Sequence, residues 1–284
     1  MNAPKSVALF TRRNTSTTGA AIARLAEMAG AAGVELIIPS EEVEKLDLGH
    51  LPDATLGGNP DVADLAIALG GDGTILGALR RYAGRDVPVF AMNFGEIGFL
   101  ATVEQDGYDA GFERALSGDF DVLSLPVLTA GVSSGDRVAV NDVSFHRRQD
   151  LRVAELGYSV AGEAVGGVRC DGLVVSTPAG STGYNLANGG PVLAWGVSGY
   201  VVSFIAPHTL TARALVVAPD DVLEVVNRSD IDPVDVTTDG RGVCTLEPQE
   251  RVEVRFEEGV AQLAQVSGAT FYRRLRDKFG RLSS

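Results

Sequence analysis

Short apolar runs alternate with longer helix-like stretches along the first part of the chain. The apolar runs have the length of buried strands, and they fall at Ser6 to Phe10, Val34 to Ile38, Asp64 to Leu69 and Val87 to Asn93. Helices are predicted between them, at Ala20 to Ala32 and at Ile75 to Tyr82. Strands that alternate with helices are typical of a parallel sheet wound in the Rossmann manner. We therefore expect residues 1–118 to form a Rossmann-like α/β domain.

The pattern changes after about Asp119, where helical periodicity gives way to β-rich segments separated by turn residues. Residues 119–265 are therefore expected to form a β-rich C-terminal domain. Its expected strands are Val122 to Ala130, Val138 to His146, Val153 to Val160, Leu173 to Ser176, Tyr200 to Ala206, Val222 to Val226, Val234 to Thr237 and Arg251 to Phe256.

The end of the chain has the pattern of a basic amphipathic helix from Phe271 to Phe279. We expect residues 266–284 to form this C-terminal helix and to pack back on the first domain. Its basic side chains are expected to form a solvated face, as long cationic side chains usually do. These residues are Arg273, Arg274, Arg276 and Lys278.

Composition and charge exclude several classes of function. The 284 residues carry a formal net charge of −13, so their long-range field repels nucleic acid and anionic membranes, and neither is an expected partner. No apolar run reaches the roughly 18 residues of a membrane span, and the N-terminus lacks a signal-peptide core. Cys170 and Cys244 are too few for a disulfide scaffold or a four-thiolate zinc site. We expect a cytoplasmic protein without a metal site of its own.

The sharpest local signal is the sequence Gly70-Gly71-Asp72-Gly73-Thr74, which directly follows a predicted strand. Its glycines let the backbone turn abruptly and bring bare N–H groups to phosphate oxygens, where the N-terminus of the next helix adds a favourable dipole. The carboxylate of Asp72 suits a metal ion or a proton beside such phosphates. We therefore expect residues 1–118 to bind a nucleotide. The alternative is an ordinary strand-to-helix turn in which Asp72 only caps the helix.

Two further motifs follow predicted strands. The first, Asn93-Phe94-Gly95-Glu96-Ile97-Gly98-Phe99-Leu100, is expected at the same carboxyl edge of the sheet as Asp72, where open α/β sheets bind ligands. The second, Asn141-Asp142, joins an amide and a carboxylate that can bind a ribose diol. The alternatives are a glycine loop over core residues for the first and an ordinary turn for the second.

The longest motif runs from Asp171-Gly172 through Ser176-Thr177-Pro178-Ala179-Gly180-Ser181-Thr182-Gly183-Tyr184-Asn185 to Gly189-Gly190-Pro191. In this motif, a predicted buried strand is followed by a loop that contains serines, threonines, glycines and one tyrosine. Such a loop can hold a polar planar ligand through its hydroxyls, its backbone and the ring face.

These four motifs, in this order, resemble those of the NAD kinase family, whose pattern runs GGDGT, NxGxLGFL, an NE or ND pair and DGxxxSTPTGSTAYxxxxGGP. GGDGT alone also occurs in lipid kinases and phosphofructokinases, so the Ser-Thr-Pro loop is the discriminating part. Pro207 to Arg213 is similar to the family's PHxLxxRP, and Asp239-Gly240 to its late DG. Five departures remove no group that the chemistry needs: Ile97, Asp142, Ala179, Gly183 and Ala214. Gly77 stands where some members have arginine, which leaves one possible phosphate contact unfilled.

The resemblance implies a kinase that transfers the γ-phosphate of ATP, accompanied by Mg²⁺ or another divalent metal, to the 2′-hydroxyl of the adenosine ribose of NAD. Asp72 would be the general base, and a homodimer or homotetramer would assemble through the second domain. The residues implied to bind phosphates are Gly70, Gly71, Gly73, Thr74, Asn93 and Gly95. Those implied to bind NAD are Asp72, Gly73, Asn141, Asp142, Arg152, Arg169, Asp171, Ala179, Thr182, Gly183, Tyr184, Asn185, Leu186, Ala187 and Arg241.

Two other functions stay open on the sequence alone. A lipid kinase that shares the GGDGT turn would have an apolar substrate cleft and no use for the Ser-Thr-Pro loop. A non-catalytic dinucleotide sensor would keep the pocket without turnover, although an unpaired carboxylate facing phosphates argues against it. The sequence also leaves open whether NADH or polyphosphate is accepted.

Overall fold

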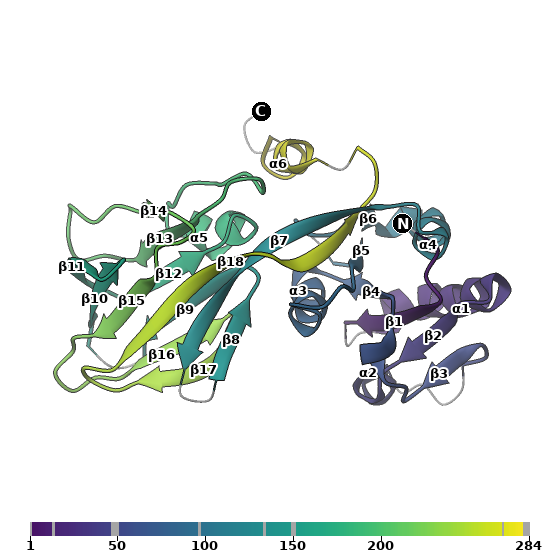
Figure 1. The fold of residues 1–284 in the computed structure, drawn as a ribbon, viewed down its shortest axis with the longest axis horizontal. Helices are drawn as coiled ribbons and strands as arrows, with labels where there is room; N and C mark the ends of the chain where they lie inside the picture. The colour runs from purple at the N-terminus through teal and green to yellow at the C-terminus, as the bar shows by residue number, and fades with distance from the viewer. Residues whose placement is uncertain are drawn as a thin grey trace. The chain divides into compact units, whose positions relative to one another are not determined.

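The computed structural model describes residues 2–12, 15–46, 51–95, 98–132, 135–148, 152–268 and 270–280. The chain forms two compact units, whose elements are labelled in Figure 1. The first unit combines Met1–Ser124 with Ala261–Ser284, and the second is Leu125–Val260. The chain therefore builds the second unit between two segments of the first.

The first unit is an α/β structure on a parallel sheet with the strand order β5-β4-β1-β2-β3. The strands are mostly buried, and helices α1 and α4 add Leu25 and Phe112 to the core. This arrangement confirms the Rossmann-like prediction. The elements are β1 (Ser6–Thr11), α1 (Thr15–Ala32), β2 (Glu35–Ile38), α2 (Ser40–Leu46), β3 (Ala54–Leu56), the 3₁₀ helix η1 (Pro60–Val62), β4 (Leu65–Gly70), α3 (Asp72–Arg81), β5 (Val89–Asn93), β6 (Val103–Glu104), η2 (Gln105–Gly107), α4 (Tyr108–Ser117) and α6 (Phe271–Phe279).

The second unit is rich in β-strands, which confirms the predicted change of class. Its elements are β7 (Asp121–Val132), β8 (Gly135–Ala139), β9 (Asp142–Arg147), β10 (Ala154–Val160), β11 (Glu163–Cys170), β12 (Gly172–Ser176), η3 (Gly180–Thr182), α5 (Tyr184–Ala187), β13 (Tyr200–Ile205), β14 (Leu215–Val217), β15 (Leu223–Asn227), β16 (Val234–Thr238), β17 (Arg241–Leu246) and β18 (Arg251–Gln265). The first few residues of β7 and the last few of β18 belong to the first unit.

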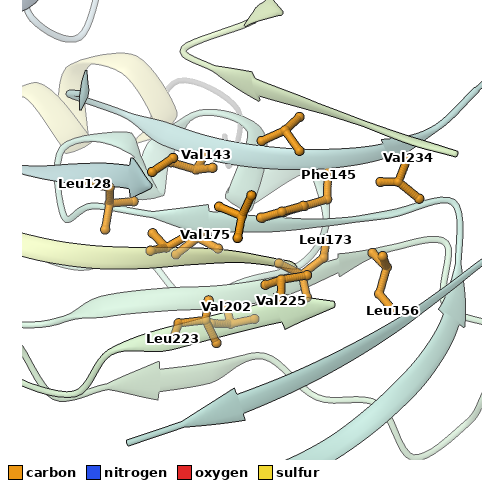
Figure 2. Close-up of a cluster of buried hydrophobic side chains, with 14 of the residues drawn as sticks. Leu128, Val143, Phe145, Leu156, Leu173, Val175, Val202, Leu223, Val225 and Val234 are labelled. Carbon is orange, nitrogen blue, oxygen red and sulfur yellow. The ribbon is translucent and has the colours of Figure 1, made fainter. Parts of the chain in front are cut away.

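The strands of the second unit form two layers around one apolar core. One layer has the order β14-β13-β12-β9-β16-β17, and the other contains β11-β10-β15-β18, with β7 beside β18 and β8 beside β7. Figure 2 shows side chains from both layers meeting, among them Phe145 and Leu173 from the first and Leu156 and Val225 from the second. The alternating burial along β15 and β16 follows from this arrangement, because one face of each strand meets the core.

The single strand expected at Val138 to His146 is wrong, because the structure divides it into β8 and β9. The two strands lie in different layers, since β8 pairs with β7 and β9 pairs with β12 and β16. At the break, the backbone N–H groups of Val140 and Asn141 donate to the carboxylate of Asp239 instead of to a neighbouring strand. A side chain far along the sequence therefore ends β8 and redirects the chain.

Among the described residues of the second unit, three strands and much of a fourth lie outside the predicted segments. These three strands are β11, β14 and β17, in which the apolar pattern is interrupted or short. Within β11, for example, Gly166-Gly167 interrupts it. Strand β18 continues past the predicted end at Phe256 as far as Gln265, although charged residues interrupt its apolar pattern. Pairing with β15 at one end and β5 at the other keeps it extended.

The prediction that all basic residues of the last helix lie on a solvated face is wrong for Arg274. Its guanidinium donates to the backbone oxygens of Phe99 and Ala101 and to the side chain of Gln265, all within the first unit. The Arg274 side chain can reach these groups because the ring of Phe271 packs on that of Phe99, with centroids 6.2 Å apart. This contact holds α6 close to the loop that contains Phe99 and Ala101. In the described part of the chain, no helix has both the length and the apolar character needed to cross a bilayer.

Candidate active site

The glycine-rich turn lies at the carboxyl end of β4, and its last three residues already belong to α3. The helix begins at Asp72, earlier than predicted, because Gly71 is its N-cap and accepts the N–H of Thr74 at 3.0 Å. A Cβ at Gly70 would lie 2.4 Å from the hydroxyl oxygen of Thr74, so only glycine fits there. Gly73 and Thr74 therefore lie in the first helical turn, whose N–H groups and dipole favour an anion.

The carboxylate of Asp72 does not cap its own helix. It accepts the backbone N–H of Phe99 at 3.0 Å and that of Leu100 at 3.1 Å, both from the loop that follows β5. Asp72 itself is half-buried, and a carboxylate has room for about four acceptor bonds, so it can still reach a proton or a cation. The interpretation of Asp72 as a simple cap is therefore wrong.

Asn93 and Gly95 connect this turn to the loop after β5. The side chain of Asn93 is 4% exposed, accepts the N–H of Gly95 at 3.0 Å and donates to Glu104 at 2.7 Å. A Cβ at Gly95 would lie 3.1 Å from the Cα of Gly71, so the two loops touch through their backbones. The predicted phosphate-binding residues of the first unit thus gather at one sheet edge, with Asn93 engaged inside the loop. Glu96 and Ile97 of this motif lie outside the described residues.

In the second unit, Asn141 and Asp142 lie at the start of β9, where Asp239 organises the backbone. The carboxylate of Asp239 accepts the N–H groups of Val140, Asn141 and Asp142 at 3.1, 2.7 and 3.1 Å. Asp239 has a φ of 45°, a left-handed value that asparagine and aspartate tolerate better than most residues. The side-chain oxygen of Asn141 is buried and has no hydrogen-bond donor among the described residues, which suits it to a ligand hydroxyl.

The Ser-Thr-Pro loop packs directly on this dipeptide. Thr177 donates from its hydroxyl to Val140 O at 2.6 Å and from its N–H to Asn141 O at 2.9 Å. The two backbone segments approach so closely that a Cβ at Gly180 would lie 2.1 Å from the carbonyl oxygen of Asn141. Sequence-distant motifs are thereby brought together, and Ala179 and Thr182 lie in the same loop.

The helical end of this loop is fixed by Asn185, which is completely buried. Its amide donates to the carbonyl oxygens of Ser181 at 3.0 Å and Pro191 at 2.9 Å. Tyr184, beside it in α5 with Leu186 and Ala187, is 37% exposed. The hydrogen bonds of Asn185 therefore fix a loop that leaves the Tyr184 side chain partly exposed.

Burial changes the titration of the groups around Asn141. Burial, with a further contribution from Asp239, raises the pKa of Asp142 to about 7. Tyr184 stacks on His146 with ring centroids 5.6 Å apart. Burial lowers the pKa of His146 and so favours its neutral ring.

The remaining predicted NAD-binding residues are polar groups at the surface of the second unit. Asp171 is engaged by Arg147, whose Nε lies 2.6 Å from its carboxylate. Arg169 lines a cavity of about 530 Å³ together with His208 and Arg213. Arg152 and Arg241 are exposed. The structure therefore places Arg169 in that cavity and leaves the other two guanidiniums available to solvent.

Sequence reasoning missed several groups beside the predicted ones. Arg12, just after β1, donates to Phe94 O at 2.7 Å, and the rule that ligands gather at the carboxyl edge of a sheet would have suggested it. His146 bonds Ser144 at 2.8 Å, and Ser144 bonds Thr237 at 2.7 Å. Ser144 and His146 are two residues apart in β9, whereas Thr237 lies in β16, and no sequence signal links it to them. In the described ranges, no three His, Cys, Asp or Glu side chains cluster as metal ligands would.

Comparison with known proteins gives consistent results. The ATP-NAD kinase N-terminal domain matches residues 31–120, and the ATP-NAD kinase C-terminal domain matches residues 140–266. A protein of Ralstonia nicotianae named NAD kinase is 33% identical over 279 residues, which cover 96% of this chain and 92% of that protein. A protein of Gemmatimonas aurantiaca with the same name is 38% identical over 225 residues, 76% of this chain and 77% of that protein.

Two solved structures share the fold. Yeast NADH kinase complexed with NADH has a TM-score of 0.87 at 23% identity, over 100% of this chain and 90% of that one. An NAD kinase from Archaeoglobus fulgidus in complex with ATP has a TM-score of 0.73 at 23% identity, over 98% of each chain. The two domain matches and the extent of the Ralstonia alignment show that this chain belongs to the ATP-NAD kinase family.

Proposed function

We propose that this chain is an NAD kinase that transfers the γ-phosphate of ATP to the 2′-hydroxyl of the adenosine ribose of NAD and so makes NADP. The observation that carries the proposal is the Asp72 carboxylate, held by two backbone N–H groups beside the glycine-rich start of α3. Family membership supports the substrates, since relatives over nearly the whole chain are named NAD kinase.

Asp72 is proposed as the general base. Its carboxylate takes the proton of the ribose hydroxyl while that oxygen forms a bond to the γ-phosphorus, and the bond from this phosphorus to the β–γ bridging oxygen breaks, so that ADP leaves. The N–H donors Phe99 and Leu100 fix the carboxylate in one orientation, which matters because phosphoryl transfer depends mainly on positioning. Gly70, Gly71, Gly73 and Thr74 would hold phosphates at the positive end of the α3 dipole.

The chemistry of the donors near Asp72 fits a hard cation. The carboxylate oxygens of Asp72 and the hydroxyl of Thr74 are oxygen donors of the kind that Mg²⁺ prefers, and Mg²⁺ commonly keeps few protein ligands when it binds through a triphosphate. When bound, the metal would neutralise charge that develops on the transferred phosphoryl group. This supports Mg²⁺ or another divalent metal brought by ATP.

The second unit is proposed to bind the dinucleotide. The unbonded Asn141 oxygen and the buried Asp142 carboxylate suit the two hydroxyls of a ribose, because each is an acceptor. Tyr184 offers a ring for stacking. The other proposed contacts are Arg152, Arg169, Asp171, Ala179, Thr182, Gly183, Asn185, Leu186, Ala187 and Arg241.

We also propose a cytoplasmic homo-oligomer, either a dimer or a tetramer. Large apolar side chains are exposed on the second unit, among them Leu210 at 93%, with Val165 on β11 and Val216 on β14 each at 49%. An edge strand with exposed apolar residues can pair or pack with a second chain, and this supports the proposed oligomer.

The direct test of the function is to incubate the purified chain with ATP, Mg²⁺ and NAD and to identify the products by chromatography. NADP and ADP should appear in equal amounts, and a chelator should abolish both. A dinucleotide sensor would bind NAD without consuming ATP, and a lipid kinase would ignore NAD but phosphorylate a lipid alcohol. Either of those results would contradict the proposal.

A further inference from the structure

The C-terminal helix α6 contacts the loop whose backbone N–H groups donate to Asp72. The ring of Phe99 contacts two rings of α6, with its centroid 6.2 Å from that of Phe271 and 5.8 Å from that of Phe279. Beside them, the Arg274 guanidinium donates to Phe99 O at 2.9 Å and to Ala101 O. Its other amino group donates to the Gln265 side chain at 2.5 Å. Apolar and charged contacts from one helix thus fix the same few residues.

One peptide group connects Arg274 to Asp72. The Phe99 carbonyl, which accepts from Arg274, belongs to the same planar peptide group as the Leu100 N–H, which donates to Asp72. In a trans peptide these two bonds point in opposite directions, so the guanidinium and the carboxylate lie on opposite sides of the group. A cation on the carbonyl side polarises the N–H toward the anion and strengthens its bond.

The Arg274 guanidinium is fixed by its surroundings. Burial lowers the pKa of Arg274 to about 10, while the charges of Asp72 and Glu104 act in the opposite direction, so the side chain stays cationic at neutral pH. Gln265 lies at the end of β18 and also donates to Thr102 at 3.3 Å. The strand, the loop and the helix therefore share one hydrogen-bonded cluster.

We propose that Arg274 is a positioning residue for phosphoryl transfer, which acts through the Phe99–Leu100 peptide to hold the Asp72 carboxylate in its working orientation. This inference rests on the proposed function, in which Asp72 is the base. Arg274 itself need not touch either substrate. Its loss should therefore affect the chemical step more than the binding of NAD.

The test compares Arg274→Met with Arg276→Met, which removes an arginine from the same helix. Arg276 is a matched control because its side chain is 71% exposed and pairs with its neighbour Asp277. In the Arg274 variant, kcat should fall about tenfold to a hundredfold with little change in KM for NAD, because a small displacement of a catalytic group has an effect of that size. The control should keep the wild-type kcat, and Arg274→Lys should recover part of the loss because an ammonium can still donate to a carbonyl.

Amide hydrogen exchange of the full chains provides a readout that does not depend on activity. Exchange at Phe99 and Leu100 should be at least about tenfold faster in Arg274→Met than in Arg276→Met, because the local opening of that loop becomes easier. If the methionine variant does not fold, the lysine variant must show both a lower kcat than the control and faster exchange in this loop.

An Arg274 variant with unchanged kcat, or with unchanged exchange at Phe99 and Leu100, would overturn the inference. So would an equal loss of kcat in Arg276→Met, because general damage to the helix would then explain it. Wild-type protein that makes no NADP would instead overturn the proposed function, and the exchange comparison would still decide whether Arg274 orders the loop around Asp72.

Discussion

At the scale of single residues, the chain surrounds each candidate group with neighbours that set its position and charge. Asp72 is held by N–H donors from a separate loop, and Asp239 fixes the backbone under Asn141 and Asp142. The sequence motifs could mark Asp72 and Asn141 as candidate site residues, because their neighbours along the chain form the pattern. They could not predict Arg274, because a basic residue on an amphipathic helix looks the same whether it faces solvent or a buried carbonyl.

Replacing Asp72 with Asn keeps the size of the side chain and an oxygen acceptor but removes the proposed base. We expect kcat to fall by about two to four orders of magnitude while NAD still binds. Steady-state kinetics with NAD, together with a binding measurement by calorimetry, checks this. Near-normal turnover in a correctly folded variant would show that Asp72 is not the base.

Asp142 should make the free protein less stable as the pH rises. Its pKa is raised to about 7 in the folded chain from 3.8, so between these values the folded state binds more protons than the unfolded state, and the free energy of unfolding falls with rising pH. Asp142→Asn removes this dependence. Its gain in melting temperature over the wild type should therefore be small at about pH 4 and larger at about pH 8.

Thermal unfolding of the ligand-free proteins at the two pH values measures this difference. Asp220→Asn is the control, because Asp220 is an exposed aspartate of the same unit. An Asp142 variant whose gain is equal at both pH values, or larger at the acidic one, would contradict the account.

At the scale of elements, the sequence pattern predicted those strands and helices whose formation depends on residues close together in the chain. The alternation of strands and helices up to β5 was predictable because buried parallel strands need continuous apolar runs. The division between β8 and β9 was not, because the partner that ends β8 is Asp239, far along the chain. Strand β11 was not predicted, because Gly166-Gly167 interrupts the alternation of apolar and polar residues along the sequence. In the folded chain, hydrogen bonding to β10 keeps this segment extended.

Contact between the Ser-Thr-Pro loop and the start of β9 should be sensitive to a single methyl group. In Gly180→Ala, the new Cβ would meet the Asn141 carbonyl oxygen at 2.1 Å, so one of the two backbones must shift. We expect a loss of about 1 to 3 kcal/mol in the free energy of unfolding and a higher KM for NAD. Gly196→Ala, which meets no atom within 4 Å, should change neither quantity. Equal stability of the two variants in denaturant titrations would contradict the close approach.

At the scale of the whole molecule, exposed apolar residues on the second unit predict self-association. Light scattering at micromolar concentration should give a mass of at least twice the 29.7 kDa of one chain. Leu210→Glu should lower that mass, because a charge replaces an apolar side chain that is 93% exposed in the segment before the edge strand β14. Ile231→Glu, at a residue 69% exposed on another loop, is the control. A wild-type mass near that of one chain would contradict the oligomer.

The proposed kinase activity is tested most sharply by finding which hydroxyl of NAD accepts the phosphate. We expect NAD with ATP and Mg²⁺ to give NADP, whereas an NAD analogue that lacks only the adenosine 2′-hydroxyl should bind but accept no phosphate, because the nucleophile is missing. Mass spectrometry of both reactions, with binding of the analogue measured in parallel, gives the answer. Phosphate on the deoxy analogue, or no NADP from NAD with any metal or phosphate donor, would contradict the account.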